Sequence, residues 1–122
     1  MKTILIIEDE IAYVKLLNDQ LSSKGYTVIE AHDGQTGLQM ALREQPNLIL
    51  LDIRLPKMDG LTVLHEIRKD PWGRDANVII LTNLDDSKTI STAMHEIISK
   101  YVVKNEASLE SVIDDIKIIL KE

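Results

Sequence analysis

The chain has 122 residues, a formal net charge of −6, 44% hydrophobic residues and no cysteine. This length indicates one domain over residues 1–122, and the hydrophobic content excludes a disordered tail. The lack of cysteine excludes a disulfide framework and a thiolate metal site. The acidic balance argues against direct nucleic-acid binding, and no apolar stretch approaches membrane-spanning length. We therefore expect a cytoplasmic protein that directly contacts neither a membrane nor nucleic acid.

Short apolar stretches of strand length recur five times along the chain. In chain order they cover residues 3–7, 26–31, 48–51, 77–82 and 101–104. The third and fourth are almost continuously apolar, which is typical of strands that are covered on both faces of a sheet. The second alternates between apolar and polar residues, which favours a place nearer an edge.

Stretches with apolar residues at helical spacing follow these strands. In chain order the expected helices cover residues 11–24, 38–45, 60–69, 90–97 and 109–120. Gly25 and Pro46 are typical of the residues that follow a helix. Between the second strand and the second helix, Asp33-Gly34 predicts a turn.

The alternation of strand and helix, with short connections, predicts an α/β fold. Right-handed crossovers between parallel strands place helices on both faces, so we expect a doubly wound, five-stranded parallel sheet. A closed barrel of the same repeat needs about twice this length, which favours the open sheet.

Functional groups follow four of the five strands. They are Glu8 and Asp9 after the first, Asp52 after the third, Thr82 at the end of the fourth and Lys104 at the end of the fifth. The carboxyl ends of parallel strands lie along one rim, where open α/β sheets bind ligands. Each residue alone has an ordinary explanation, such as an acid near a helix N-terminus or a lysine in solvent. Together they predict a functional site.

The chemistry of these groups points to a cation and a phosphoryl group. At about 4 Å and an effective dielectric of about 20, two carboxylates repel by roughly 4 kcal/mol, so three need a counter-charge. Oxygen ligands with room for water suit Mg²⁺ or Mn²⁺ better than zinc. The Lys104 ammonium and the Thr82 hydroxyl suit phosphoryl oxygens, and Asp52 is then the nucleophile that forms an acyl phosphate.

These residues stand in motifs that resemble the receiver domains of two-component response regulators, over essentially the whole chain. The motifs are Ile6-Ile7-Glu8-Asp9-Glu10, Leu51-Asp52 through Pro56 with Met58-Asp59-Gly60, Leu81-Thr82, and Tyr101-Val102-Val103-Lys104. The resemblance implies a receiver domain over residues 1–122 with the flavodoxin-like receiver fold.

The resemblance also implies a role for each site residue. Asp52 is expected as the phosphoacceptor, with Thr82 and Lys104 holding the phosphoryl oxygens. Asp9 should bind Mg²⁺ directly, Glu8 through water, and Arg54 through its backbone carbonyl. Tyr101 resembles the aromatic switch residue that turns inward when Thr82 moves toward the phosphate.

The expected partners follow from the same resemblance. A histidine kinase or phosphotransfer protein should donate the phosphoryl group, and an output protein should bind the face formed by the fourth helix, fifth strand and fifth helix. Such a domain catalyses only its own phosphorylation and dephosphorylation. Arg54, Asn83 and Leu84 flank Asp52 and Thr82, so we expect them to tune the phosphate lifetime by controlling the approach of water.

The chain departs from the family pattern at three positions. Asn105 follows Lys104 where proline is usual, Asn83 follows Thr82 where a small residue is usual, and Ile97 stands where a glycine usually follows the fourth helix. These departures affect the expected shape of the output face more than the chemistry.

Three other functions are weighed against a receiver. An aspartate-nucleophile phosphatase needs a second aspartate two positions after the nucleophile, where this chain has Arg54. A non-phosphorylated interaction domain of the same fold would use the acids only to bind metal. A flavin carrier is the weakest, because no Ser/Thr-rich phosphate loop follows the first strand.

Overall fold

The computed structural model describes residues 2–84, 87–96 and 98–121 of the chain. These residues form a five-stranded sheet in which every strand pair is parallel. Its strands are β1 (Thr3–Ile7), β2 (Thr27–Ala31), β3 (Leu48–Leu51), β4 (Val78–Thr82) and β5 (Lys100–Val103). Their spatial order is β2-β1-β3-β4-β5, which places β2 at an edge, as its alternating sequence predicts.

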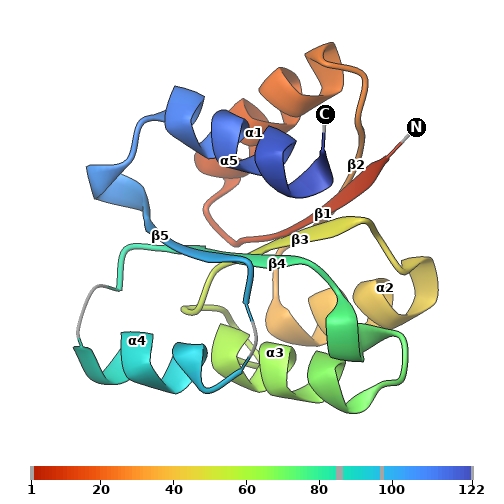
Figure 1. Ribbon diagram of the computed structural model, residues 1–122, viewed down its shortest axis with the longest axis vertical. Coiled ribbons are helices and arrows are strands. Elements are labelled where there is room, and N and C mark those ends of the chain that lie inside the picture. The colour runs from red at the N-terminus through yellow and green to blue at the C-terminus, as the bar shows by residue number, and fades with distance from the viewer. Residues whose placement is uncertain (1, 85–86, 97, 122) are drawn as a thin grey trace.

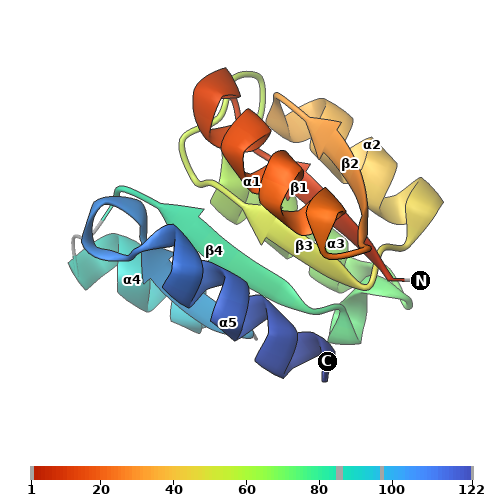
Figure 2. The same cartoon turned by 90° about the horizontal axis from the view of Figure 1, so that it is seen from above.

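Helices cover both faces of this sheet, which confirms the doubly wound α/β prediction. They are α1 (Ile11–Ser23), α2 (Gly34–Glu44), α3 (Gly60–Lys69), α4 (Ser87–Met94) and α5 (Leu109–Leu120), with short 3-10 turns at Gly73–Asp75 and Lys104–Glu106. Figure 1 shows α1 and α5 on one face and α2, α3 and α4 on the other. Seen from above, α1 and α5 lie side by side over the sheet (Figure 2).

Successive strand residues pack into two separate hydrophobic cores, because side chains alternate between the two faces of a pleated sheet. Ile4 and Ile6 pack with α1 and α5, whereas Leu5 and Ile7 pack with α2 and α3. Every residue of β3 and β4 is buried, as expected for central strands. The strands are therefore held from both sides, and the groups that follow them start from fixed positions.

Some element boundaries differ from the sequence predictions. Asp33-Gly34 is not a turn: the Asp33 carboxylate accepts a hydrogen bond from the Thr36 N–H at 2.7 Å, and Gly34 opens α2. The fifth strand ends at Val103, so Lys104 begins a 3-10 turn. The fourth helix starts at Ser87. The departure at Ile97 lies outside the described residues.

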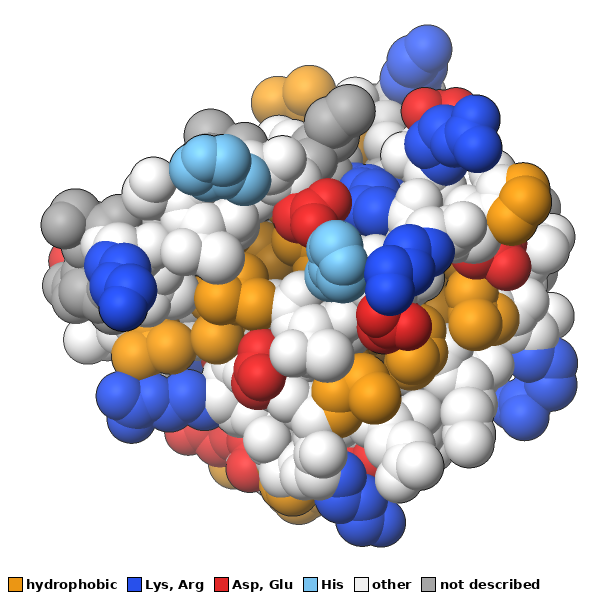
Figure 3. All heavy atoms as spheres, turned by 90° about the horizontal axis from the view of Figure 1, so that it is seen from below, with side chains coloured by type: hydrophobic (Ala, Val, Ile, Leu, Met, Phe, Trp, Pro, Cys, Tyr) orange, Lys and Arg blue, Asp and Glu red, His pale blue; other side chains and the backbone are white. Residues whose placement is uncertain are grey.

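The surface over α2, α3 and α4 is mixed in character. Hydrophobic side chains are interspersed there with acidic, basic and histidine side chains (Figure 3). Within the described ranges, no helix combines the length and the apolar character needed to cross a membrane.

Candidate functional site

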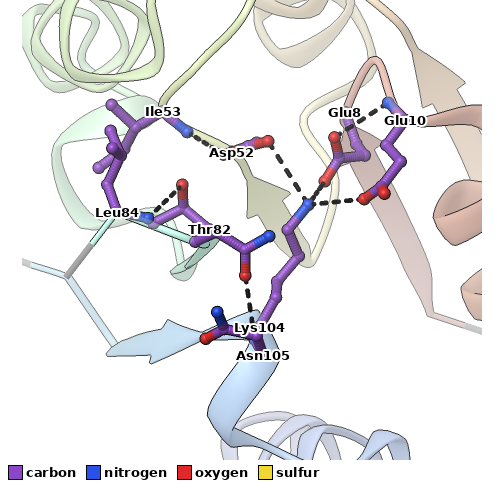
Figure 4. A network of polar contacts seen from close by, with 9 residues as sticks. Glu8, Glu10, Asp52, Ile53, Thr82, Leu84, Lys104 and Asn105 are labelled. Atoms are coloured by element: carbon purple, nitrogen blue, oxygen red, sulfur yellow. Dashed lines mark hydrogen bonds and ion pairs between the residues drawn. The ribbon is translucent and has the colours of Figure 1, made fainter.

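The register of the central strands brings the predicted groups together. Ile7 pairs with Leu51, so the residues that follow them, Glu8 and Asp52, leave the sheet side by side. Thr82 pairs with Val103, which places Lys104 next to the end of β4. Figure 4 shows these side chains converging from four strand ends. Among the described residues, the buried polar side chains are Glu8, Asp52 and Thr82, and all three belong to this site.

The carboxylates of Glu8, Asp9 and Asp52 form an acidic cluster at the ends of β1 and β3. One oxygen from each residue lies within 4.8 Å of the others. Glu8 and Asp52 are buried, whereas Asp9 is exposed, so the cluster is rigid on one side and open to solvent on the other. This all-oxygen donor set fits Mg²⁺ or Mn²⁺. Arg54 lines the adjoining pocket, and the role of its carbonyl as a ligand stays a prediction.

Backbone groups orient two of these carboxylates. The Asp52 Oδ1 accepts a hydrogen bond from the Ile53 N–H at 2.7 Å, which leaves Oδ2 facing Lys104. The Glu8 Oε2 accepts from the Glu10 N–H at 3.0 Å, which leaves Oε1 to the same lysine. Each carboxylate therefore keeps one oxygen fixed by the backbone and presents the other to the site.

Glycine at position 60 lets α3 start directly against Asp52. The Gly60 N–H donates to the Ile53 carbonyl at 2.7 Å, and the Asp59 carboxylate caps the helix at the Thr62 N–H. A Cβ at residue 60 would lie 2.1 Å from the Asp52 carbonyl oxygen, which no side chain can tolerate. The packing of α3 thus fixes the backbone of the candidate nucleophile.

The Lys104 ammonium neutralises the cluster across the rim. Its Nζ lies 2.5 Å from Glu8 Oε1, 3.2 Å from Glu10 Oε1 and 3.6 Å from Asp52 Oδ2. Its side chain is only 7% exposed, and Nζ sits 4.7 Å from the centroid of the Tyr13 ring. The contacts of Glu10 and Tyr13 with Lys104 are not predictable from the sequence, because they require the two ends of the chain to meet here. The run of three acids before α1 is the signal that could have suggested Glu10.

Burial and charge shift the ionisation of these groups. Burial raises the pKa of the Glu8 carboxyl to about 7, against the lowering effect of the hydrogen bonds from Lys104 and Glu10, and the nearby Asp52 charge adds to the rise. Burial opposes the charge on Lys104, but its carboxylate partners prevail and raise the pKa of the ammonium. Burial also raises the pKa of the Tyr13 hydroxyl. A cation that needs an ionised Glu8 must therefore compete with a proton near neutral pH.

A pocket of about 210 Å³ opens beside Asp52. Its lining residues are Asp52, Arg54, Thr82, Asn83, Leu84 and Lys104. The structure thus gathers the expected phosphoacceptor, both expected phosphoryl ligands and the three expected tuning residues around one opening. The geometry suits an anion that touches Asp52 while Lys104 and Thr82 supply donors.

The segment after β4 is tied to β5. The Tyr101 hydroxyl donates a hydrogen bond to the Leu84 carbonyl, and the half-buried ring packs with Leu84 against the α2/α3 core. The Thr82 Oγ1 accepts a long hydrogen bond of 3.4 Å from the Leu84 N–H. Tyr101 is therefore placed to sense a movement of Thr82, although its two-position switch stays a prediction.

Similarity to known proteins agrees with this arrangement. The chain matches the family model of the response regulator receiver domain over residues 4–117. It is 41% identical over 101 residues to the probable transcriptional regulator ycf27 of Porphyridium aerugineum, across 83% of this chain and 41% of that protein. The chain spans about two fifths of the length of the ycf27 relatives that it matches.

Solved structures of similar fold cover the whole domain. The receiver domain of the sensor histidine kinase PA1611 of Pseudomonas aeruginosa, with a magnesium ion coordinated in its active site cleft, is 26% identical, with a TM-score of 0.88 over 99% of this chain and 98% of that one. The Mn²⁺-bound form of the response regulator Rcp1 is 29% identical, with a TM-score of 0.80 over 98% of this chain and 89% of that one. These similarities give no support to a phosphatase or to a phosphate-free interaction domain.

Proposed function

The chain belongs to the response regulator receiver domain family, and from that premise we propose that residues 1–122 form one receiver domain whose phosphoacceptor is Asp52. The observation that carries this assignment is the place of Asp52, whose Oδ2 faces Lys104 at 3.6 Å beside the acidic cluster. Its other oxygen is held by the Ile53 N–H, so a single oxygen is free to attack.

The acidic cluster is the proposed site of Mg²⁺ or Mn²⁺. Asp9 and Asp52 would bind the cation directly and Glu8 through water, with the Arg54 carbonyl as a further ligand. The magnesium-bound receiver of PA1611 and the Mn²⁺-bound Rcp1 support this choice of metal. The bound cation supplies positive charge that offsets the phosphoryl oxygens.

The residues of the chain carry out the transfer itself. The Asp52 Oδ2 attacks phosphorus in the phosphohistidine of a histidine kinase or phosphotransfer protein. A phosphorus–oxygen bond forms, the phosphorus–nitrogen bond breaks, and the electron pair leaves with the imidazole. Lys104 and the Thr82 hydroxyl donate hydrogen bonds to the transferred oxygens, for which Lys104 must give up a carboxylate partner. The domain catalyses only this transfer and the later hydrolysis of the acyl phosphate.

The phosphorylated domain would signal through Thr82 and Tyr101. A shift of Thr82 toward the phosphoryl group pulls on the segment to which Tyr101 is bonded, and the face formed by α4, β5 and α5 changes its affinity for an output protein. Arg54, Asn83 and Leu84 line the path of water to the phosphate and tune its lifetime. We place this activity in the cytoplasm, with no direct contact to a membrane or nucleic acid.

Labelling with a small phosphodonor tests the assignment. Acetyl phosphate with Mg²⁺ should add one phosphoryl group, seen by intact mass, and Asp52→Ala should abolish it. The matched control is Asp19→Asn, an exposed acid on α1 outside the site, which should label like the wild type. Removing Mg²⁺ with a chelator should also prevent labelling. Full labelling of Asp52→Ala would overturn the proposal.

A further inference from the structure

Two of the residues that depart from the family pattern meet across the rim of the site. Asn83 follows Thr82 at the end of β4, and Asn105 follows Lys104 just beyond β5. The N–H of Asn105 donates a hydrogen bond to the Asn83 Oδ1 at 3.0 Å. This bond therefore joins the neighbours of the two groups that are proposed to hold the phosphoryl oxygens.

The two departures are chemically complementary. Proline at position 105 has no N–H to donate, and a small side chain at position 83 without an acceptor leaves such an N–H to solvent. The pair in this chain supplies one donor and one acceptor in contact with each other. The two residues therefore act together through one hydrogen bond, rather than separately on the site.

We propose that this hydrogen bond, the Asn83–Asn105 clamp, positions Thr82 and Lys104 relative to each other and so sets the affinity of the site for a phosphoryl group. The inference rests on the proposed function. Asn83 is a positioning residue here, acting through the backbone of Thr82 and Lys104, whose side chains make the contacts. The clamp lies on the β4–β5 side, whereas the acidic cluster lies on β1 and β3, so the clamp governs the phosphoryl group and leaves the cation site unchanged.

A second restraint acts on the same segment from the other direction. The Tyr101 hydroxyl holds the Leu84 carbonyl, while the Asn105 N–H holds the Asn83 side chain. Residues 82–84 are consequently held at two successive positions, one facing the core and one facing solvent. Loss of the outer restraint leaves Thr82 less well placed without disturbing the core.

Position 105 offers a matched pair of variants. Asn105→Ala removes the side chain but keeps the backbone N–H, whereas Asn105→Pro removes both. Asn83→Ala removes the acceptor, and the double variant Asn83→Ala/Asn105→Pro restores the residue types usual in the family. Both residues are exposed, so all four proteins should fold.

The test measures the half-saturating concentrations of beryllofluoride and of acetyl phosphate at saturating Mg²⁺. Asn83→Ala and Asn105→Pro should each raise them by roughly three- to tenfold, the range expected for one hydrogen bond. Asn105→Ala should match the wild type, and the double variant should be no worse than either single variant, since both remove the same bond. Mg²⁺ affinity without a phosphoryl donor should be equal in all four proteins.

Several results would overturn the clamp. They are wild-type affinity in both Asn83→Ala and Asn105→Pro, equal defects in Asn105→Ala and Asn105→Pro, or additive defects in the double variant. Amide exchange of residue 105, followed by NMR, tests the bond independently of phosphorylation: it should be faster in Asn83→Ala and unchanged in Asn105→Ala. Failure of the wild type to label at Asp52 would refute the proposed function, whereas unchanged exchange in Asn83→Ala would refute the clamp alone.

Discussion

The β1–β3 side and the β4–β5 side of the rim are built in different ways. On the first side, Glu8 and Asp52 follow buried central strands and are 3% and 7% exposed. On the second side, Lys104 and Asn83 follow an edge strand and its neighbour, and hydrogen bonds between side chains and backbone hold the segments in place. Both sides begin at strands that the core holds, but on the second side the segments after β4 and β5 are held by a few individual contacts.

This difference separates a rigid part of the site, which holds the carboxylates, from a part that can move in response to a phosphoryl group. A displacement on the β1–β3 side requires two packed cores to move, so the proposed cation site and the proposed nucleophile are preorganised. A displacement of the segments after β4 and β5 costs only one or two hydrogen bonds, so the proposed phosphoryl group is expected to move them. Substitutions on the first side should therefore affect stability strongly, and those on the second mainly the response.

The largest effect is expected from Gly60→Ala on the β1–β3 side. The new Cβ would meet the Asp52 carbonyl oxygen at 2.1 Å and the Ile53 Cα at 2.7 Å, so backbone must move. We expect the free energy of unfolding to fall by about 4 kcal/mol, measured by urea denaturation. Gln39→Ala, at an exposed position on α2, is the control. A loss below about 1 kcal/mol would show that this side is softer than proposed.

Lys104→Met should affect both sides, because Lys104 follows β5 and its ammonium neutralises carboxylates that follow β1 and β3. Without the ammonium, Glu8 and Asp52 lose their shared counter-charge. At pH 8 the free energy of unfolding should fall by about 3 kcal/mol, and less at pH 5, where Glu8 is protonated. Mg²⁺ should bind the variant more tightly, as calorimetry would detect. Unchanged Mg²⁺ affinity would mean that Lys104 does not compete with the cation.

The stability of the wild-type protein should also depend on pH through Glu8 on the β1–β3 side. The pKa of Glu8 rises from 4.5 to about 7 on folding, so its stabilising effect is complete below about pH 4.5 and is lost as the pH rises to about 7. This loss should amount to about 3 kcal/mol in the free energy of unfolding. The difference between wild type and Glu8→Gln across this range isolates the effect. Parallel pH curves for the two proteins would contradict it.

Tyr101→Phe should have the smallest effect, on the β4–β5 side. It removes the donor to the Leu84 carbonyl but keeps the ring against the core, so the free energy of unfolding should fall by about 1 kcal/mol. Labelling of Asp52 should persist. Tyr13→Phe keeps its ring over Lys104 and serves as the control. A large stability loss in Tyr101→Phe alone would contradict the proposal that the β4–β5 side is held more weakly than the β1–β3 side.

The order of strands and helices could be predicted because the apolar runs of β1, β3 and β4 are buried in their expected places. The continuous runs at β3 and β4 are central, and the alternating run at β2 is at an edge. The start of α2 differs from the prediction because Asp-Gly is a common turn pair that can also cap a helix. The choice here depends on Asp33 bonding Thr36 and on Gly34 packing against the Met58 carbonyl, which are tertiary contacts.

The site likewise has a part that strand topology predicts and a part that depends on tertiary contacts. Glu8, Asp9, Asp52, Thr82 and Lys104 could be placed together from sequence, because topology alone brings strand ends to one rim. The contacts of Lys104 with Glu10 and Tyr13 could not be predicted, since they depend on the direction of a long side chain whose partner Glu10 is 94 positions away in the sequence. The bond between Asn83 and Asn105 likewise needs the spacing of two loops.

The three carboxylates around Lys104 also have a kinetic consequence. An ammonium can donate three hydrogen bonds, and here it donates to Glu8 and Glu10 while the Asp52 Oδ2 lies 3.6 Å away. The ammonium is therefore not available to an incoming phosphoryl donor until another positive charge binds these carboxylates. We expect binding to be ordered, with the divalent cation binding before the phosphoryl donor. A higher concentration of phosphoryl donor should then not compensate for a lack of magnesium.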